Sequence, residues 1–182
     1  MKTTRKEFLQ KSITGLAGLL ILPTLSSYSP QNGKPVVVHA GEGETYWIGP
    51  RNSPLTINIS RDKFGNETMS LCTELIAVGE GIPLHKHLNE DELIFIHRGQ
   101  GMLILNDQEF LVKEGSAALV PKGTWHKITN TGTETLTMVF SYSPAGFEGY
   151  FRELGSPVGT PWQPKTAEEF AALDKKWGIV YK

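Results

Sequence analysis

The fold of this chain is decided by GEGIPLHKHLNEDELIFIHRG, residues 79–99, together with GSAALVPKGTWHKITN, residues 115–130. Both stretches alternate short apolar runs with turns rich in glycine, proline, asparagine or aspartate, which is typical of β-strands joined by tight turns. Between them they hold three histidines and one glutamate at spacings that one metal ion could bring together. We therefore expect a β-barrel with an internal metal site.

Strand signals continue on both sides of these stretches. Apolar and polar residues alternate, or β-branched residues gather, at 56–60, 69–78, 93–97, 102–105, 109–112, 117–120, 125–129 and 135–142. A turn is expected at 62–66 and another at Asn106-Asp107. So many short strands at near-regular spacing predict an all-β sandwich or barrel and not a parallel α/β sheet.

The chain divides into four expected parts. Residues 1–29 are an export signal, 30–44 a linker, 45–145 the barrel, and 146–182 a C-terminal extension. Within the extension, glycines and prolines at 155–161 argue against regular structure. Thr166 and Glu169 form the pattern of a capping box, Phe170, Leu173 and Trp177 follow at helical spacing, and Gly178 ends the pattern. We expect a short amphipathic helix there, docked on the barrel by one face.

The first 29 residues have the order of a secretory signal. Lys2, Arg5, Lys6 and Lys11 precede the short apolar run 13–22, and a polar run follows. The segment around Arg5-Lys6 resembles the twin-arginine export motif, with Lys6 where the second arginine is expected. A surface amphipathic helix or an uncleaved anchor are the alternatives. The sequence thus predicts an exported protein, periplasmic or secreted.

Composition excludes several classes of protein. The 182 residues are 39% hydrophobic, which argues against a disordered or a bilayer-embedded chain. The formal net charge is −1 and no Lys/Arg run occurs beyond the N-terminus, so no nucleic-acid partner is expected. Cys72 is the single cysteine, and we expect it to pack as a small core residue.

Four residues are the candidate metal ligands. Side chains two apart on a strand share a face, so His85 and His87 aim together while Lys86 turns away. A turn follows, and Glu92 begins the returning strand opposite the pair; His126 lies on a later strand. Three imidazoles and one carboxylate suit one divalent transition metal, such as Mn, Fe, Co, Ni, Cu or Zn, with one or two positions left open.

Other candidates carry less weight. A histidine on a strand is more often a core or surface residue than a ligand, but here every spacing agrees across both stretches. Asp91 is the second choice of carboxylate if the strand register slips by one residue. His97 faces away from Glu92 and is expected to be structural or at the surface, and His39 lies in the linker without a role.

The two stretches resemble the paired motifs of the cupin superfamily, G-x5-H-x-H-x4-E-x6-G and G-x5-P-x-G-x2-H-x3-N. Every motif position is met between Gly79 and Asn130. The resemblance covers about residues 45–145 and implies a single jelly-roll barrel, or double-stranded β-helix, of six or more strands. It also implies ligand roles for the four candidates and a homodimer as the usual state.

A narrower resemblance concerns the segments that flank the barrel. Residues 143–151, and 41–44 before Tyr46-Trp47, are similar to the corresponding segments of single-domain cupins of the quercetin 2,3-dioxygenase type. That resemblance implies oxygenolytic ring opening of a flavonol or a related enol, with dioxygen as second substrate. Glu92 would then act both as ligand and as catalytic base.

Five aromatic residues could line the apolar pocket that a flat substrate needs, although core and tail packing is the interpretation we favour for most of them. They are Trp125, Phe140, Tyr142, Phe147 and Phe151. Two other classes of function stay open. One is a non-redox sugar isomerase, epimerase or lyase, and the other is an exported metal-dependent small-molecule binding protein. Arginine or lysine side chains pointing into the barrel would favour the non-redox enzyme.

Overall fold

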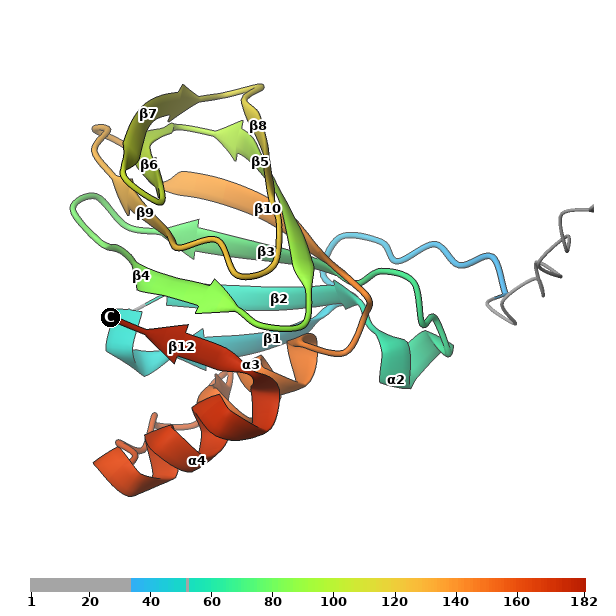
Figure 1. The fold of residues 1–182 in the computed structure, drawn as a ribbon. Helices are drawn as coiled ribbons and strands as arrows, with labels where there is room; N and C mark the ends of the chain where they lie inside the picture. The colour runs from blue at the N-terminus through green and yellow to red at the C-terminus, as the bar shows by residue number, and fades with distance from the viewer. Residues whose placement is uncertain (1–33, 52) are drawn as a thin grey trace, which may run out of the picture. The chain divides into compact units, whose positions relative to one another are not determined.

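A computed structural model describes residues 34–51 and 53–182 (Figure 1). The predicted export signal at 1–29 and the first part of the predicted linker lie outside the described residues. The described residues belong to one compact unit. In the described part, twelve strands are arranged in two sheets, and all strand pairs are antiparallel. The prediction of an all-β barrel is confirmed.

The first sheet has seven strands in the order β11-β1-β2-β3-β10-β5-β8, and the second has five in the order β12-β4-β9-β6-β7. The first contains β1 Glu44–Ile48, β2 Ser53–Ile59, β3 Leu71–Ile76, β5 Asp91–Arg98, β8 Ala117–Val120, β10 Leu136–Ser143 and β11 Ser156–Pro157. The second contains β4 Gly81–His87, β6 Gln100–Leu105, β7 Gln108–Lys113, β9 His126–Asn130 and β12 Ile179–Tyr181. Strands that are neighbours in a sheet are therefore often far apart in the sequence. Strand β10, for example, lies between β3 and β5.

The core lies between the two sheets and is built by alternation along the strands. In β10 every second residue from Leu136 to Tyr142 is buried, and in β5 Glu92, Ile94 and Ile96 are buried while their neighbours face outward. Cys72 is fully buried in the same core, as expected. Burying one large apolar side chain in this way stabilises the folded state by roughly 1.5–3 kcal/mol. The choice of which face of each strand points inward is therefore strongly fixed.

Two turns show why the strand pairs meet where they do. Asn106 has φ of +53°, a conformation that asparagine tolerates well, and it begins the two-residue turn between β6 and β7. Gly99 has φ of +84° between β5 and β6, and a Cβ there would approach the carbonyl oxygen of Thr135 at 3.0 Å. A residue larger than glycine would therefore strain the turn that follows the predicted metal-binding strand.

The helices agree with the sequence in part. Helix α4, Ala167–Trp177, begins at Thr166 with a complete capping box and ends at Gly178 in the left-handed region, as predicted. Leu173 is buried on its inner face. No helix in the part of the chain that the structure describes is long and apolar enough to span a membrane.

Four elements differ from the sequence prediction. The expected turn at 62–66 is a one-turn helix, α2 Arg61–Phe64, capped by Ser60 and ended by Gly65. The stretch 155–161 is not wholly irregular, because β11 pairs with β1 there. Helix α3 Glu148–Leu154 and strand β12 were not predicted. Both are too short for periodicity to identify, and their tertiary contacts stabilise them.

Helix α3 is held against the barrel by an ion-pair network around Arg152. Its guanidinium donates hydrogen bonds to both carboxylate oxygens of Glu44 on β1, at 2.9 and 3.0 Å, and to Ser60 and Asp62 beside α2. The hydrogen bonds from Arg152 lower the pKa of Glu44 from its ordinary value. The network thus joins α3 to the first strand and to α2.

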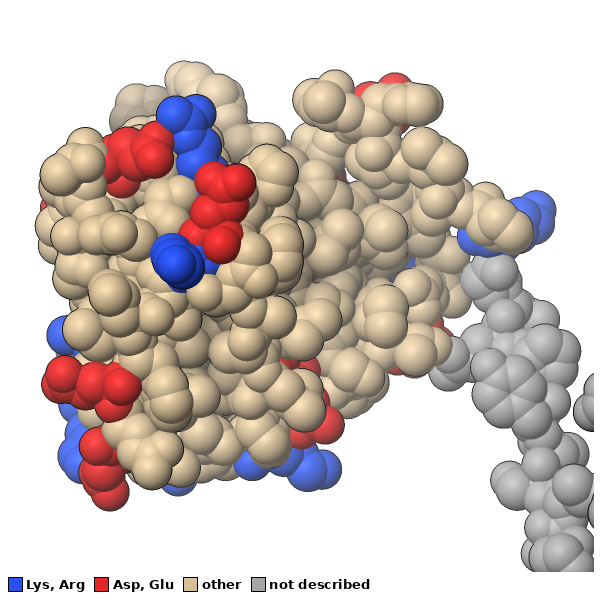
Figure 2. Space-filling model, turned by 90° about the horizontal axis from the view of Figure 1, so that it is seen from above, with Lys and Arg blue, Asp and Glu red and all other residues tan. Residues whose placement is uncertain are grey.

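Charged side chains are scattered over the surface. On the face shown in Figure 2, the described Lys and Arg residues and the Asp and Glu residues form small separate groups with uncharged surface between them. This face therefore presents no broad positive surface to a polyanion. The expectation that nucleic acid is not a partner stays a prediction.

We predict that Glu44→Gln destabilises the protein in a pH-dependent way. Because the pKa of Glu44 is lower in the folded state, its contribution is present above the unfolded value of 4.5 and is lost as the pH falls through the folded value. Glu44→Gln should lower the free energy of unfolding by about 1 kcal/mol at pH 7 and by less at pH 3, measured by urea denaturation. Equal losses at the two pH values would contradict the prediction. The exposed Glu109→Gln is the control, with changes within about 0.5 kcal/mol.

Candidate metal centre

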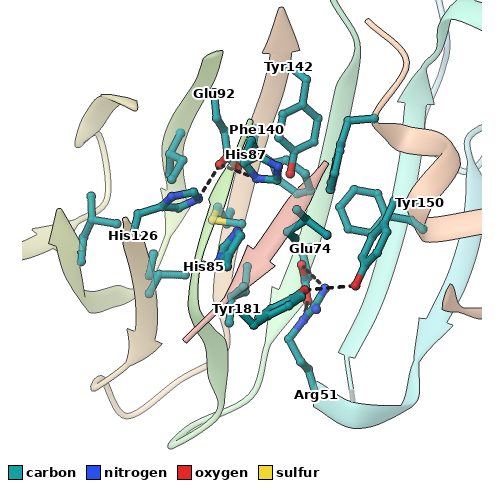
Figure 3. A pocket seen from close by; sticks show the side chains of 18 residues that line it. Arg51, Glu74, His85, His87, Glu92, His126, Phe140, Tyr142, Tyr150 and Tyr181 are labelled. Carbon is teal, nitrogen blue, oxygen red and sulfur yellow. Dashed lines mark hydrogen bonds and ion pairs between the residues drawn. The ribbon is translucent and has the colours of Figure 1, made fainter. Parts of the chain in front are cut away.

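The four predicted ligands come together inside the barrel, from both sheets (Figure 3). His85 and His87 lie on β4, His126 lies on the neighbouring strand β9 directly opposite His85, and Glu92 reaches in from β5 of the other sheet. All four are at most 5% exposed. One ligand atom from each residue lies within 4.8 Å of the others. Register on three strands therefore sets the geometry of the cluster.

Short contacts join Glu92 to two imidazoles. Its Oε2 lies 2.9 Å from Nε2 of His126 and 3.5 Å from Nε2 of His87. The His85 ring lies next to that of His126, with ring centroids 4.0 Å apart. The carboxylate oxygen therefore lies among the imidazole nitrogens, where a cation bound by all of them would sit.

Backbone carbonyls orient two of the imidazoles. Nδ1 of His85 lies 2.8 Å from the Pro83 carbonyl oxygen, and Nδ1 of His126 lies 3.0 Å from that of Thr124. A carbonyl oxygen only accepts, so in each ring Nδ1 carries a hydrogen and Nε2 is directed into the cluster. Such outer hydrogen bonds are the usual way in which a protein fixes a metal-binding histidine.

The electrostatics favour ligand-competent protonation states for His85 and Glu92, whereas Glu92 draws His126 towards its protonated form, from which a metal would displace the proton. Burial, together with the neighbouring His126 and His87, holds the pKa of His85 well below its ordinary value, so this ring is neutral. Burial alone would raise the pKa of Glu92, but His126 and His87 outweigh it and lower the pKa well below the usual range. Burial opposes a charge on His126 as well, but Glu92 raises its pKa overall. An ionised carboxylate beside a neutral imidazole is what a divalent ion needs.

Buried polar atoms without a hydrogen-bond partner are a further reason to expect a metal ion in the cluster. Both ring nitrogens of His87, Oε2 of Glu92 and Nε2 of His126 are buried and have no hydrogen-bond partner. Leaving such groups unpaired in a core costs about 1–3 kcal/mol each, which a bound cation would offset. Bonds of about 2.0–2.2 Å place ligand atoms roughly 3–4.4 Å apart, so the four groups need only a small inward shift. The cluster can therefore hold one divalent transition metal.

The other candidates lie elsewhere. Asp91 is exposed, and its Oδ1 accepts a hydrogen bond from the backbone N–H of Lys122, so the alternative register is wrong. His97 is exposed on the outer face of β5, as expected. His39 is exposed, and its backbone N–H donates to Glu42. None of these three side chains belongs to the cluster.

A small cavity adjoins the cluster. We call it the inner cavity; the space open to the centre of a water molecule is about 20 Å³, room for one or two waters. Its walls are mostly apolar and include Ile94, Leu103, Ile128, Met138, Phe140 and Phe147. Four of the five aromatic residues that the sequence analysis proposed for such a pocket line this cavity. They are Phe140, Tyr142, Phe147 and Phe151. These four are also buried core residues, so pocket lining and core packing coincide.

Trp125 is the exception among the five aromatic residues. It is half-buried and does not line the inner cavity; Nζ of Lys86 lies 4.7 Å from its ring centre and that of Lys182 5.8 Å. Cation–π contact of this kind is typical of a residue at the surface.

A buried ion pair, missed at the sequence level, forms another wall of the inner cavity. Arg51 donates two hydrogen bonds to Glu74, from Nε at 3.0 Å and Nη2 at 3.3 Å, and Ser53 donates a third. All three side chains are buried. The alternation of Cys72, Glu74 and Ile76 was the available signal, because it places Glu74 on the inner face of β3. Arg51 had no such signal, since it lies in a short 3₁₀ helix, Gly49–Arg51.

Tyrosines from the C-terminal part complete this wall. Tyr181 on β12 stacks on His85, with ring centroids 5.6 Å apart and planes at 29°. Its hydroxyl lies 3.2 Å from that of Tyr150 on α3. Figure 3 shows both tyrosines on the side of the cavity where Arg51 and Glu74 lie. Residues distant in the sequence therefore close the barrel beside the candidate metal centre.

Comparison with known proteins agrees with this geometry. The cupin-domain family model matches residues 72–142. The uncharacterized protein YrkC of Bacillus subtilis is 30% identical in an alignment 142 residues long, which covers 69% of this chain and 70% of that protein. The uncharacterized protein MJ1618 of Methanocaldococcus jannaschii is 36% identical over 80 residues, 43% of this chain and 64% of that protein. The chain described here therefore belongs to the cupin family.

Two further similarities bear on the site and the fold. Quercetin 2,3-dioxygenase of Bacillus subtilis is 28% identical over 146 residues, which cover 78% of this chain but only 40% of that protein. The crystal structure of a predicted oxalate decarboxylase from Thermotoga maritima superposes with a TM-score of 0.52 at 23% identity, covering 60% of this chain and 99% of that one. The latter likeness shows the cupin fold.

We predict that metal binding depends on His87. Wild-type protein should carry close to one transition-metal ion per chain, and His87→Ala should carry almost none, by elemental analysis. Added metal should raise the thermal midpoint of the wild type, because a ligand at a hundred times its Kd adds about 2.7 kcal/mol of stability. The exposed His97→Ala is the matched control and should behave as the wild type. Equal metal contents in all three proteins would overturn the prediction.

We predict a large cost for breaking the buried ion pair. Arg51→Met leaves the Glu74 carboxylate buried with Ser53 as its remaining hydrogen-bond partner, and should lower the free energy of unfolding by about 3–5 kcal/mol. Arg51→Met combined with Glu74→Leu should cost less than Arg51→Met alone. The matched control is Arg98→Met, which breaks an exposed pair with Glu134 and should cost under about 1 kcal/mol in urea denaturation. A double variant as unstable as the sum of its single variants would contradict this account.

Proposed function

We propose that this cupin is a metal-dependent dioxygenase that acts on a flavonol-like or other enol small molecule. The observation that carries the proposal is the buried cluster of three imidazoles and one carboxylate facing an apolar, aromatic cavity. The similarity to quercetin 2,3-dioxygenase over 78% of the chain supports it. A dioxygenase incorporates both oxygen atoms into its product, so the reaction needs no external reductant.

The residues of the chain have distinct roles in this proposal. His85, His87, Glu92 and His126 would hold the metal. When bound, the metal would act as a Lewis acid that stabilises an enolate, and it would exchange electrons with dioxygen. Oε2 of Glu92 lies at the cavity beside Nε2 of His126, and with the histidines holding a metal this carboxylate would accept the enol proton of a bound substrate. Tyr142 and Phe147, whose rings lie 4.9 and 4.3 Å from that of His87, exclude water from the reacting atoms.

The charge of the cavity argues against the non-redox alternative. An enzyme that grips a sugar acid or a carboxylate by more than a bound metal needs a further available cation, and Arg51 is the one Lys or Arg side chain among the described residues lining the inner cavity. Its charge is matched by Glu74 through two hydrogen bonds. A neutral or metal-bound enol is therefore the better match to these walls.

Oxygen uptake tests the proposal. Metal-loaded wild-type protein with quercetin should consume about one dioxygen per substrate converted. Glu92→Gln, which removes the proton acceptor and keeps the side-chain size, should lower kcat by about 10²-fold or more. His97→Ala is the control with unchanged uptake. Turnover that continues without oxygen would favour an isomerase or lyase, saturable binding without turnover a binding protein, and zinc as the native metal would overturn the proposal.

A further inference from the structure

A second, larger pocket lies on the other side of the tyrosine wall. We call it the outer pocket; its volume is about 320 Å³, and its walls include Pro50, Pro83, Leu154, Phe170 and Asp174. Pockets of this size hold organic ligands, whereas the inner cavity of about 20 Å³ holds at most a water or two. An organic substrate that reaches the cluster must therefore enlarge the inner cavity as it enters.

Three residues line both spaces, namely Arg51, Tyr150 and Tyr181. Arg51 is buried and fixed by Glu74, and Tyr150 is 1% exposed on α3. Tyr181 is half-buried and belongs to the three-residue strand β12. Of the three, Tyr181 is the most exposed side chain, and it also covers the imidazole of a candidate ligand, His85.

A chain of hydroxyl contacts holds Tyr181 in place. The Asp174 carboxylate only accepts, so the Tyr150 hydroxyl donates to it at 3.1 Å, and the Tyr181 hydroxyl then donates to Tyr150 at 3.2 Å. Asp174 lies on α4 and lines the outer pocket. A hydroxyl group arriving in the outer pocket can replace one donor in this chain and release Tyr181.

The strand that carries Tyr181 is the easiest part of the wall to move. In the described part of the chain β12 pairs with β4 alone, at the edge of its sheet, over three residue pairs. Short edge strands open locally at much lower free energy than central strands. Strand β4 keeps its second neighbour, β9, when β12 moves, so His85 and His126 stay in register.

We propose that the outer pocket is the docking site from which a flat, neutral, hydroxylated aromatic molecule reaches the cluster, and that Tyr181 is the gate between the two spaces. Pro50, Pro83 and Phe170 offer apolar contact to a ring, and Asp174 accepts a hydrogen bond from a ring hydroxyl. Arg51 is matched by Glu74, so Asp174 leaves the pocket without a surplus positive charge, which disfavours small anions. The aromatic substrate class rests on the proposed function.

The rate of arrival of 4-nitrocatechol, a small flat phenol whose absorbance changes on metal coordination, tests the gate when the pH is kept below the pKa of its more acidic hydroxyl, so that the probe is neutral. In stopped-flow mixing with metal-loaded protein, Tyr181→Ala should speed association about tenfold, and Tyr181→Phe, which loses one hydroxyl contact, should speed it less. Pro50→Trp, which fills the outer pocket from an exposed wall position, should slow it about tenfold. The control Phe110→Ala, on β7 at the opposite edge of the sheet, should stay within about twofold.

Equilibrium dialysis of the same phenol against metal-free protein tests the docking site without any metal. Pro50→Trp should weaken binding about tenfold or more, and oxalate at equal concentration should not compete. The inference is overturned if Pro50→Trp changes neither binding nor arrival rate, or if oxalate displaces the phenol. Pro50 is exposed, so we expect Pro50→Trp to fold. This variant therefore still tests the docking site if Tyr181→Ala fails to fold.

The outcomes separate the gate from the proposed function. Normal arrival of the phenol with no oxygen uptake counts against the dioxygenase and leaves the docking site standing. Oxygen uptake with quercetin, together with arrival rates that Tyr181 and Pro50 do not influence, counts against the gate and leaves the dioxygenase standing.

Discussion

The burial of the Glu92 carboxylate among three imidazoles is the constraint on which the rest of this structure depends. A carboxylate that is 3% exposed must be ionised and paired, or the core is destabilised. The barrel meets this need by bringing His87 and His126 within 3.5 Å of the carboxylate from the opposite sheet. Both sheets must therefore keep their register, because a slip of one residue would turn a ligand out to solvent.

The C-terminal part of the chain turns an open barrel into a closed one. Strand β12 adds to the edge of the second sheet beside β4, and α3 and α4 pack below it (Figure 1). Through Tyr150 and Tyr181 these elements supply the wall between the candidate metal centre and the outer pocket. The C-terminal segment, predicted as an extension of the barrel, thus lines the candidate site.

The proposed ligand class rests on the charge and shape of the two sides of that wall. The inner cavity offers aromatic and aliphatic surface around ligand-competent imidazoles, and the outer pocket offers apolar surface with one carboxylate acceptor. The guanidinium that lines both spaces is committed to Glu74. A flat molecule with hydroxyl donors satisfies both environments, whereas a small anion finds no unmatched cation among the described lining residues.

The sequence by itself determined most of the barrel strands, several of the turns between them and the four candidate ligands that meet inside the barrel. His85 and His87 share a face because strand side chains alternate, and the glycine and proline turns fix where each strand ends. Helix α4 was equally readable from Thr166 to Gly178, since capping is a local interaction. All of these features depend on interactions between residues that lie within a few positions of one another in the sequence.

Only the tertiary structure decided the ion pair of Arg51 and Glu74, strand β12 and the placement of Tyr181 on His85. Arg51 and Glu74 lie 23 residues apart, and β12 pairs with a strand more than ninety positions earlier. Three residues of β12 carry too little periodicity to predict a strand, and their stability comes from the edge of a sheet that other parts of the chain build. The candidate ligands were therefore readable from local pattern, whereas the wall between the inner cavity and the outer pocket was not.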